Sequence, residues 1–334
     1  MVRWERSDPR TTRAWHQVPT TTLPQASQPA SNNLMYDFAA DIADCAQAVE
    51  TALDGQLDAG HLSGPGPTAD RLVAAMRHGA LEGGKRLRPL LVRQAAAIFN
   101  VPAPQVLTAG LAVEMVHCYS LIHDDLPAMD NDDLRRGRPT VHKAYDDATA
   151  ILAGDALLTH AFGLLSDTAC HPDPAVRIAL VTELVRGSGA GGMVGGQMRD
   201  IEGEKAGLSP DEISTMQAMK TGALIRASVR IGAILGGADP RALAVLTAYA
   251  EAAGRAFQLA DDILDVTATP EVMGKATGKD AALGKQTLVA QLGLEGARTR
   301  LDQIVAEALS CLRTFGPKAD GLRATARYFA SREN

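Results

Sequence analysis

The fold class that the sequence predicts is all-α, a single large helical bundle of residues 35–334. Hydrophobic residues make up 46% of the 334-residue chain but aromatic residues only 4%. Ala and Leu are abundant and runs of β-branched residues are scarce; Ala and Leu enter helices at little cost, whereas β-branched side chains are restricted there. No segment alternates apolar and polar residues over a useful strand length, so helices should build the whole core.

Apolar residues recur with the helical period along most of the chain. Residues 1–34 are the exception: they are rich in Thr, Pro, Gln, Ser and Asn, and we expect a disordered tail there. A helix capped by Asp70 should include Leu81. The other expected helices are residues 35–58, 87–99, 104–124, 145–167, 174–190, 211–235, 241–265 and 296–313. Residues 148–165 and 223–238 are apolar nearly all round, which predicts central helices.

Composition also limits the class of function. The net charge of −6 argues against a general nucleic-acid binder, which needs a basic surface. The four cysteines are far apart and form no CxxC pair, which is typical of reduced thiols in a cytosolic protein. We find no apolar run of the ~18 residues that a transmembrane helix needs, and no apolar core of a secretory signal. We therefore expect a cytoplasmic protein without a membrane span.

Two aspartate clusters carry the chemistry. The first contains Asp124, Asp125 and Asp130, and the second contains Asp261, Asp262 and Asp265. Crowded carboxylates in an apolar setting repel one another unless a cation joins them. Sites made only of oxygen ligands favour hard divalent ions, and Mg²⁺ completes its coordination with water and substrate phosphates.

The two clusters differ in spacing. Asp261 and Asp265 are four residues apart and share one face of a helix. Asp124 and Asp130 are six residues apart, and an ideal helix would point their side chains in different directions. Pro127 disturbs a helix and disfavours helical geometry at the residue before it, so the helix should end there and let Asp130 return beside Asp124.

Basic groups flank both acidic clusters in an otherwise acidic protein. Arg offers a planar fork to phosphate oxygens and Lys a mobile point charge, so these groups favour a metal-bound diphosphate ligand. The basic groups occur in the segment Gly83–Pro89, at Arg135 and Arg136, at Lys220, and at Lys275 and Lys285. A glycine-rich segment, residues 187–196, lacks the GK[ST] of a phosphate-binding loop, so its small residues should instead permit a close approach of a helix to another helix or to a ligand.

In these segments the chain resembles the polyprenyl diphosphate synthases, the short-chain trans-prenyltransferases, and looks most like the bacterial farnesyl type. The resemblance rests on GGKRLRP, HCYSLIHDDLPAMDNDDLRRG, MKTGALI, FQLADDILD and MGKATGKDAALGK, and it runs from about residue 36 to the C-terminus. It implies an isoprenoid-synthase helical bundle with a central substrate cavity. It also implies head-to-tail condensation of isopentenyl diphosphate with dimethylallyl or geranyl diphosphate, giving farnesyl diphosphate and diphosphate.

The resemblance also implies a role for each matching residue. Asp124 and Asp130 would bind magnesium with Asp125 in support, and Asp261, aided by Asp265, would take the last of three magnesium ions. Isopentenyl diphosphate would be held by Gly84, Lys85, Arg88, His117 and Arg136. The allylic diphosphate would be held by Arg135, Lys220, Lys275 and Lys285. Thr221 and Gln258 would direct oxygen dipoles at the developing cation and, with Lys220, form the catalytic set. A homodimer is the usual assembly of this family.

Product length should depend on the helix before the first cluster. In this family the residues four and five before the first aspartate form the floor of the pocket for the growing chain, and here they are Ser120 and Tyr119. At ~1.5 Å rise per residue, Tyr119 lies roughly 7–8 Å from Asp124 along the helix. Its ring should stop growth at a farnesyl product.

Three other functions remain open at this point. A geranylgeranyl diphosphate synthase would make a longer product. A class I terpene cyclase would usually carry an Asn/Ser/Glu metal triad in place of the second cluster and would not need GGKRLRP. A non-catalytic prenyltransferase subunit would usually lack one of the aspartate motifs.

Overall fold

The computed structural model describes residues 36–62, 64–81, 83–267 and 288–331, and residues 36–334 form one compact unit by their contacts. The helices are α1 (Phe38–Gln56), α2 (Asp70–Ala80), α3 (Leu87–Ala97), α4 (Ala103–Asp124), α5 (Val141–Ala144), α6 (Asp147–Ser166), α7 (Pro174–Ser188), α8 (Met193–Ala206), α9 (Pro210–Gln217), α10 (Ala223–Leu235), α11 (Pro240–Thr267), α14 (Leu288–Cys311) and α15 (Asp320–Ala330). A π-helix η1 (Ala218–Gly222) and a 3₁₀ helix η2 (Leu312–Ala319) complete them. The predicted all-α class is confirmed.

Polar side chains begin several helices at the residues where the helical period starts. Asp37 and Asp146 accept hydrogen bonds from the backbone N–H groups of the first turns of α1 and α6, and Ser209 forms a reciprocal capping box with Glu212 at α9. Such caps satisfy N–H groups that have no partner inside the helix. The expected Asp70 cap is wrong: Ala69 precedes α2, and Asp70 is its first residue.

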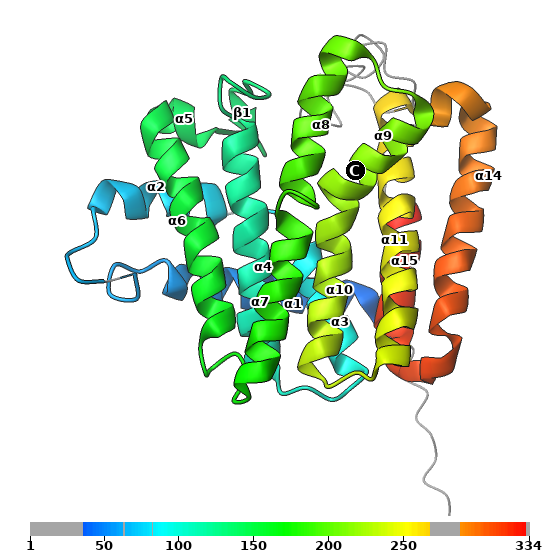
Figure 1. The fold of residues 1–334 in the computed structure, drawn as a ribbon, viewed down its shortest axis with the longest axis horizontal. Coiled ribbons are helices and arrows are strands. Elements are labelled where there is room, and N and C mark those ends of the chain that lie inside the picture. Colours follow the sequence, from blue (N-terminus) through cyan, green and yellow to red (C-terminus); the bar gives the residue numbers. More distant parts are fainter. Residues whose placement is uncertain (1–35, 63, 82, 268–287, 332–334) are drawn as a thin grey trace, which may run out of the picture. The chain divides into compact units, whose positions relative to one another are not determined.

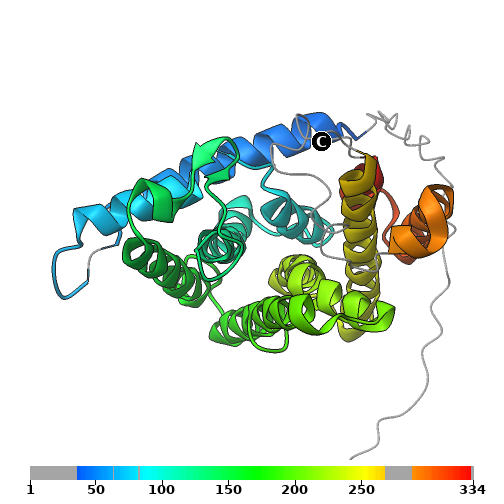
Figure 2. The ribbon, with the colours of Figure 1, turned by 90° about the horizontal axis from the view of Figure 1, so that it is seen from above.

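The long helices α4, α6, α7, α10, α11 and α14 run roughly alongside one another, while α1 and α2 cross them (Figures 1 and 2). α4 packs against α6 and α3, and α10 packs against α3, α7 and α11. α4 and α10 are buried along most of their length. This confirms the prediction that residues 223–238 form a central helix.

The same prediction is wrong for α6, because one of its faces is exposed. Ile151 is 44% and Leu152 56% exposed, and both lie on that helix. α4 and α6 are also the two helices in the described part of the chain that are long and apolar enough to cross a membrane by length and composition alone. α4 meets this criterion as a buried core helix, and α6 meets it through its apolar outer face.

The sequence prediction missed several elements. A two-residue hairpin, β1 (Leu134–Arg135) paired with β2 (Arg138–Pro139), follows the first aspartate cluster. Both α8 and α15 were left without a predicted helix. The single helix expected over residues 211–235 contains the wider turn η1 in its middle, and a π turn of this kind inside a helix often marks a functional site.

Pro127 acts as predicted. α4 ends at Asp124, and the chain then turns so that the N–H of Asp130 donates to the carbonyl of Asp124 at 2.8 Å. This turn and the hairpin lie at the same end of the bundle as α8 and α9 (Figure 1). The bundle therefore brings the first aspartate cluster and the hairpin together at one end (Figure 1).

Candidate active site

A cavity of about 390 Å³ lies beside the C-terminal half of α4 and extends to α8 and η1. Seven residues predicted from the sequence line it: Arg88, His117, Tyr119, Ser120, Asp124, Lys220 and Thr221. They belong to three segments that are far apart in the sequence: α3, α4 and η1. The cavity therefore combines an acidic group, several basic groups and the residues expected at the pocket floor.

Of the first aspartate cluster, Asp124 lines this cavity. Burial raises the pKa of Asp124 to about 6, Lys220 lowers it in part, and Asp130 raises it further. A carboxylate that is held near others in this way gains by binding a cation. No three His, Cys, Asp or Glu side chains in the described ranges converge to form a metal centre by themselves. Asp124 and Asp130 therefore fit an ion such as Mg²⁺, which needs only one or two carboxylates.

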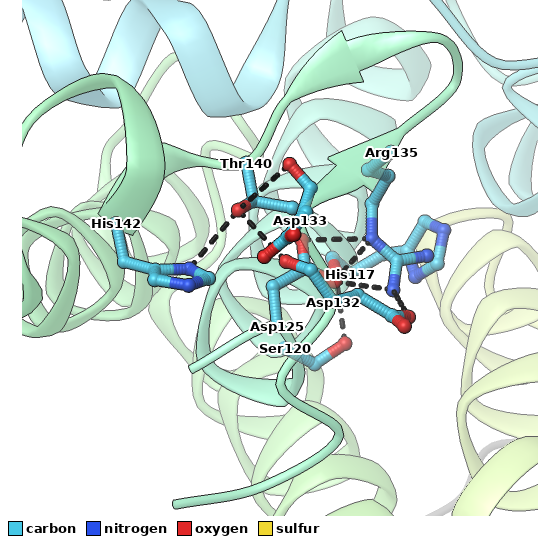
Figure 3. A network of polar contacts seen from close by, with 8 residues as sticks. All are labelled: His117, Ser120, Asp125, Asp132, Asp133, Arg135, Thr140 and His142. Carbon is cyan, nitrogen blue, oxygen red and sulfur yellow. Dashed lines mark hydrogen bonds and ion pairs between the residues drawn. The ribbon is translucent and has the colours of Figure 1, made fainter. Parts of the chain in front are cut away.

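The hairpin is attached to α4 by an ion pair. Nε of Arg135 donates to both carboxylate oxygens of Asp125, at 2.7 and 2.8 Å (Figure 3). Asp125 is 2% exposed, and a second carboxylate, Asp132, lies 3.7 Å from Arg135. The Thr140 hydroxyl, at the end of the hairpin, donates to the carbonyl of Asp132 at 2.9 Å. Asp125 thus fixes the position of Arg135 next to the acidic cluster.

A second basic group, Arg136, lies against two glycines of the segment before α3. A Cβ atom on Gly84 would be 2.6 Å from its Nη2, and one on Gly83 would be 3.0 Å from its Cδ. Both glycines have positive φ, 157° and 92° for Gly83 and Gly84 respectively. The two glycines of GGKRLRP therefore leave room for the guanidinium of Arg136.

Arg88 and His117 present further polar groups at the cavity. Nε of Arg88 is buried without a hydrogen-bond partner among the described residues, which suits an anionic ligand. Burial and then the neighbouring Arg88 hold the pKa of His117 well below its usual value. His117 is therefore a neutral hydrogen-bonding group at neutral pH, and its backbone carbonyl accepts the Ser120 hydroxyl at 2.8 Å.

The opposite wall is formed by η1 and α8. Nζ of Lys220 lies 2.7 Å from Oδ2 of Asp200 on α8. A Cβ atom on Gly196 would be 2.2 Å from the backbone N of Lys220, so only a glycine lets the two helices approach this closely. The prediction that the glycine-rich segment serves helix packing is confirmed.

The second aspartate cluster lies near the end of α11. Asp262 is 5% exposed and accepts the side-chain amides of Gln258 at 3.0 Å and Gln217 at 3.2 Å. Burial lowers the pKa of Arg88, while Glu114 and Asp261 raise it in part, so Asp261 lies within electrostatic reach of the cavity. Asp265 is on the same helix one turn later.

Tyr119, the residue predicted to form the pocket floor, makes an edge-to-face contact with a neighbouring ring. It is 5% exposed, and its ring meets His123 edge-on with centroids 5.7 Å apart. Nε2 of His123 lies 3.0 Å from the carbonyl oxygen of Ile151 on α6, and Gly154 leaves the space for this ring, because a Cβ there would be 2.1 Å from Nε2.

The predicted residues that the structure describes but that do not line this cavity are Gly84, Lys85, Asp125, Asp130, Arg135, Arg136, Gln258, Asp261 and Asp265. Lys275 and Lys285 lie outside the described residues. Nζ of Lys85 is 5.4 Å from the ring centroid of Tyr328 on α15. The sequence prediction also missed the apolar wall that α8 contributes to the cavity: Met193, Val194, Met198 and Ile201. The spacing of Met193, Gln197 and Ile201 by four residues was the available signal for that helix.

Comparisons with known proteins agree with this geometry. A family model described as polyprenyl synthetase matches residues 69–315. The chain is 47% identical over 267 residues to farnesyl diphosphate synthase of Escherichia coli, covering 78% of this chain and 89% of that protein. It is 41% identical over 312 residues to geranylgeranyl pyrophosphate synthase 9 of Arabidopsis thaliana, covering 91% and 84%.

A solved structure is similar as well. The crystal structure of an FPP/GFPP synthase from Zymomonas mobilis superposes with a TM-score of 0.77 at 44% identity, covering 87% of this chain and 98% of that one. Residues 69–315, which the family model matches, include the residues that line the cavity, both aspartate clusters and the basic segment before α3. The chain belongs to the polyprenyl synthetase family.

Proposed function

We propose that the protein is a magnesium-dependent trans-prenyltransferase that condenses isopentenyl diphosphate with dimethylallyl or geranyl diphosphate to farnesyl diphosphate and diphosphate. The observation that carries this proposal is the cavity of about 390 Å³, which is lined by the charged residues Asp124 and Lys220 and also by Tyr119 and apolar residues of α8. Such a cavity suits a ligand with an anionic head and an isoprenoid tail. The naming of the relatives in Escherichia coli and Zymomonas mobilis supports the same reaction.

Two diphosphate positions follow from the placement of the basic groups. We assign isopentenyl diphosphate to Gly84, Lys85, Arg88, His117 and Arg136. We assign the allylic diphosphate to Arg135 and Lys220, together with Lys275 and Lys285. Asp125 supports this assignment, because its two oxygens hold Arg135 by the acidic cluster.

Asp124, Asp130, Asp261 and Asp265 would hold the magnesium ions. Burial, and after it the nearby Asp130, raise the pKa of Asp124, and a bound cation would stabilise the charged form of this carboxylate. When bound, the ions would neutralise charge on the leaving diphosphate. Lys220 and Arg135 supply the same kind of stabilisation from the protein side, held ready by Asp200 and Asp125.

The bond changes balance without an external reagent. The allylic C–O bond breaks and its electron pair leaves with the diphosphate; the π electrons of isopentenyl diphosphate then form the new C–C bond. Loss of a proton to the departing diphosphate forms the new double bond. Thr221 and the amide oxygen of Gln258 would orient toward the cation, since the amide NH₂ of Gln258 is used by Asp262. The apolar wall of α8 would exclude water.

We infer a farnesyl product because the Tyr119 ring is buried at the cavity and braced by His123. A longer, geranylgeranyl product is the second candidate, but it is not favoured, because the identity to the Arabidopsis thaliana synthase is 41% and that to the Escherichia coli farnesyl diphosphate synthase is 47%. The two differ by one isopentenyl addition.

We further propose a homodimer. The outer faces of α6 and α7 expose Ile151, Leu152, Ile178 and Val185, and apolar faces of this kind usually serve association.

Residues 35–334 would form the catalytic domain. A cytoplasmic location agrees with the four cysteines, which are all unpaired.

One assay tests the function. The purified protein is incubated with Mg²⁺, isopentenyl diphosphate and either dimethylallyl or geranyl diphosphate, and the dephosphorylated products are identified by chromatography. We expect farnesol from both starters and none after chelation of the metal. A geranylgeranyl product would establish the second candidate, and a protein that forms no prenyl product would refute the proposal.

A further inference from the structure

Arg86 is the most deeply buried of the three basic residues in GGKRLRP. It is 2% exposed, although its neighbour Lys85 is exposed and Arg88 lines the cavity. It precedes the first residue of α3 with a left-handed backbone, φ 48° and ψ 41°. This conformation is uncommon for a residue with a side chain, so strong contacts must hold it.

Those contacts join three other helices. Nη1 of Arg86 donates to Oε1 of Glu114 on α4 at 2.8 Å. Nη2 donates to Oε2 of Glu50 on α1 at 2.6 Å and to the carbonyl of Ala80, the last residue of α2, at 2.7 Å. One guanidinium therefore ties the start of α3 to α1, α2 and α4.

The helices joined in this way carry the proposed isopentenyl diphosphate residues. Glu114 lies three residues, about one helical turn, before His117 on α4. Lys85 immediately precedes Arg86, and Arg88 follows it by two residues. Because Arg136 lies against Gly83 and Gly84, its position depends on the same segment.

The pair is poorly explained as a device for stability alone. Burying an ion pair has a large desolvation cost, which is repaid only if the remaining polar atoms also find partners. Nε of Arg86 and Oε2 of Glu114 are both buried without a hydrogen-bond partner among the described residues. Because the buried pair has this desolvation cost, it is better explained by the way it fixes the start of α3 against α4.

We propose that Arg86 and Glu114 are positioning residues for isopentenyl diphosphate, fixing residues 83–88 against α4 so that Lys85, Arg88, His117 and Arg136 converge on one diphosphate. The inference rests on the proposed function, and it adds two residues that do not contact substrate. The allylic diphosphate is assigned to the hairpin and η1, whereas the hydrogen bonds and ion pairs that Arg86 makes among the described residues go to α1, α2 and α4. Loss of the pair should therefore affect one substrate and spare the other.

The chain offers a matched control. Arg230 on α10 and Glu183 on α7 form a similar pair, with Nε to Oε1 at 2.7 Å and side chains 19% and 4% exposed. Neither residue lines the cavity. Arg230→Met and Arg86→Met should both lower the melting temperature. Arg230→Met should not selectively change the binding of either substrate.

The test measures steady-state constants and binding by calorimetry for each substrate in Arg86→Met, Arg86→Lys, Glu114→Gln and Arg230→Met. For Arg86→Met we expect KM and Kd for isopentenyl diphosphate to rise about tenfold, with values for geranyl diphosphate within about twofold. Arg86→Lys should recover part of the loss, because an ammonium retains the charge but not the three-directional fork. If Arg86→Met does not fold, Glu50→Gln replaces it, since the Glu50 side chain is 32% exposed.

An equal change for both substrates, or a profile like that of Arg230→Met, would overturn the positioning role. A failure of the proposed function is distinguishable, because the wild-type protein would then form no prenyl product. Calorimetry with isopentenyl diphosphate still decides the inference in that case: selective loss of binding in Arg86→Met supports it, and unchanged binding refutes it.

Discussion

A Cβ atom on Gly84 would lie 2.6 Å from Nη2 of Arg136, although the two residues belong to segments more than 50 positions apart. Real Cβ atoms do not approach this closely, so either the guanidinium or the backbone would have to move. The glycine thus sets where Arg136 stands relative to Lys85 and Arg88.

Gly84→Ala should raise KM for isopentenyl diphosphate by about tenfold, because Arg136 would be displaced from the shared anion site. The positive φ of 92° at Gly84 adds strain of its own. Gly237→Ala separates the two effects: Gly237 also has a positive φ, 67°, but no atom lies within 4 Å of the added Cβ. Kinetics of both variants check the prediction. If Gly237→Ala raises KM equally, the steric explanation is wrong.

Tyr119→Ala should lengthen the product. Removing the ring opens the cavity toward the region now occupied by Tyr119 and His123, so a longer isoprenoid chain fits. Tyr119→Phe keeps the ring and should leave the product unchanged. Chromatography of dephosphorylated products measures chain length, and a farnesyl product from Tyr119→Ala would place the floor elsewhere.

Asp124→Asn should stabilise the metal-free protein while reducing turnover by orders of magnitude. Burial raises the pKa of Asp124 from 3.8 to about 6. The folded state therefore holds this proton more tightly than the unfolded state, and the group costs stability increasingly as pH rises from about 4 to 6. Above pH 6 the cost should be about 1–2 kcal/mol after allowance for solvent screening.

Thermal melting measures this effect without magnesium. At pH 7.5, Asp124→Asn should melt above the wild type, and at pH 4 the two should converge. Magnesium with diphosphate should raise the melting temperature of the wild type alone. Equal melting at both pH values would show that Asp124 carries no such cost.

Asp262→Asn should lower kcat about tenfold with little change in either KM. Asp262 accepts hydrogen bonds from the side-chain amides of Gln258 and Gln217. An asparagine would present an NH₂ group to one of these amides, which would then have to rotate. Asp261→Asn is the comparison, since it should raise the magnesium concentration needed for half-maximal rate. A similar magnesium shift in Asp262→Asn would make Asp262 a metal residue rather than a support for Gln258.

The sequence alone determined the helical class and the chemistry-bearing residues, because both depend on local information. Helical periodicity is a property of neighbouring residues, and Pro127 dictates the end of α4 wherever that helix lies in the fold. The family motifs likewise pointed to Arg88, His117, Asp124 and Lys220 before their meeting at one cavity was known.

Only the tertiary structure decided how these groups are held. Whether Asp125 faces a metal or Arg135 depends on where the hairpin returns, and whether Arg86 binds ligand or three helices depends on how α1, α2 and α4 pack. The exposed apolar face of α6 was mistaken for a central one. The sequence shows that a helix face is apolar, but only the packed structure shows whether another element covers that face. The reason is that burial depends on residues that are distant in the sequence.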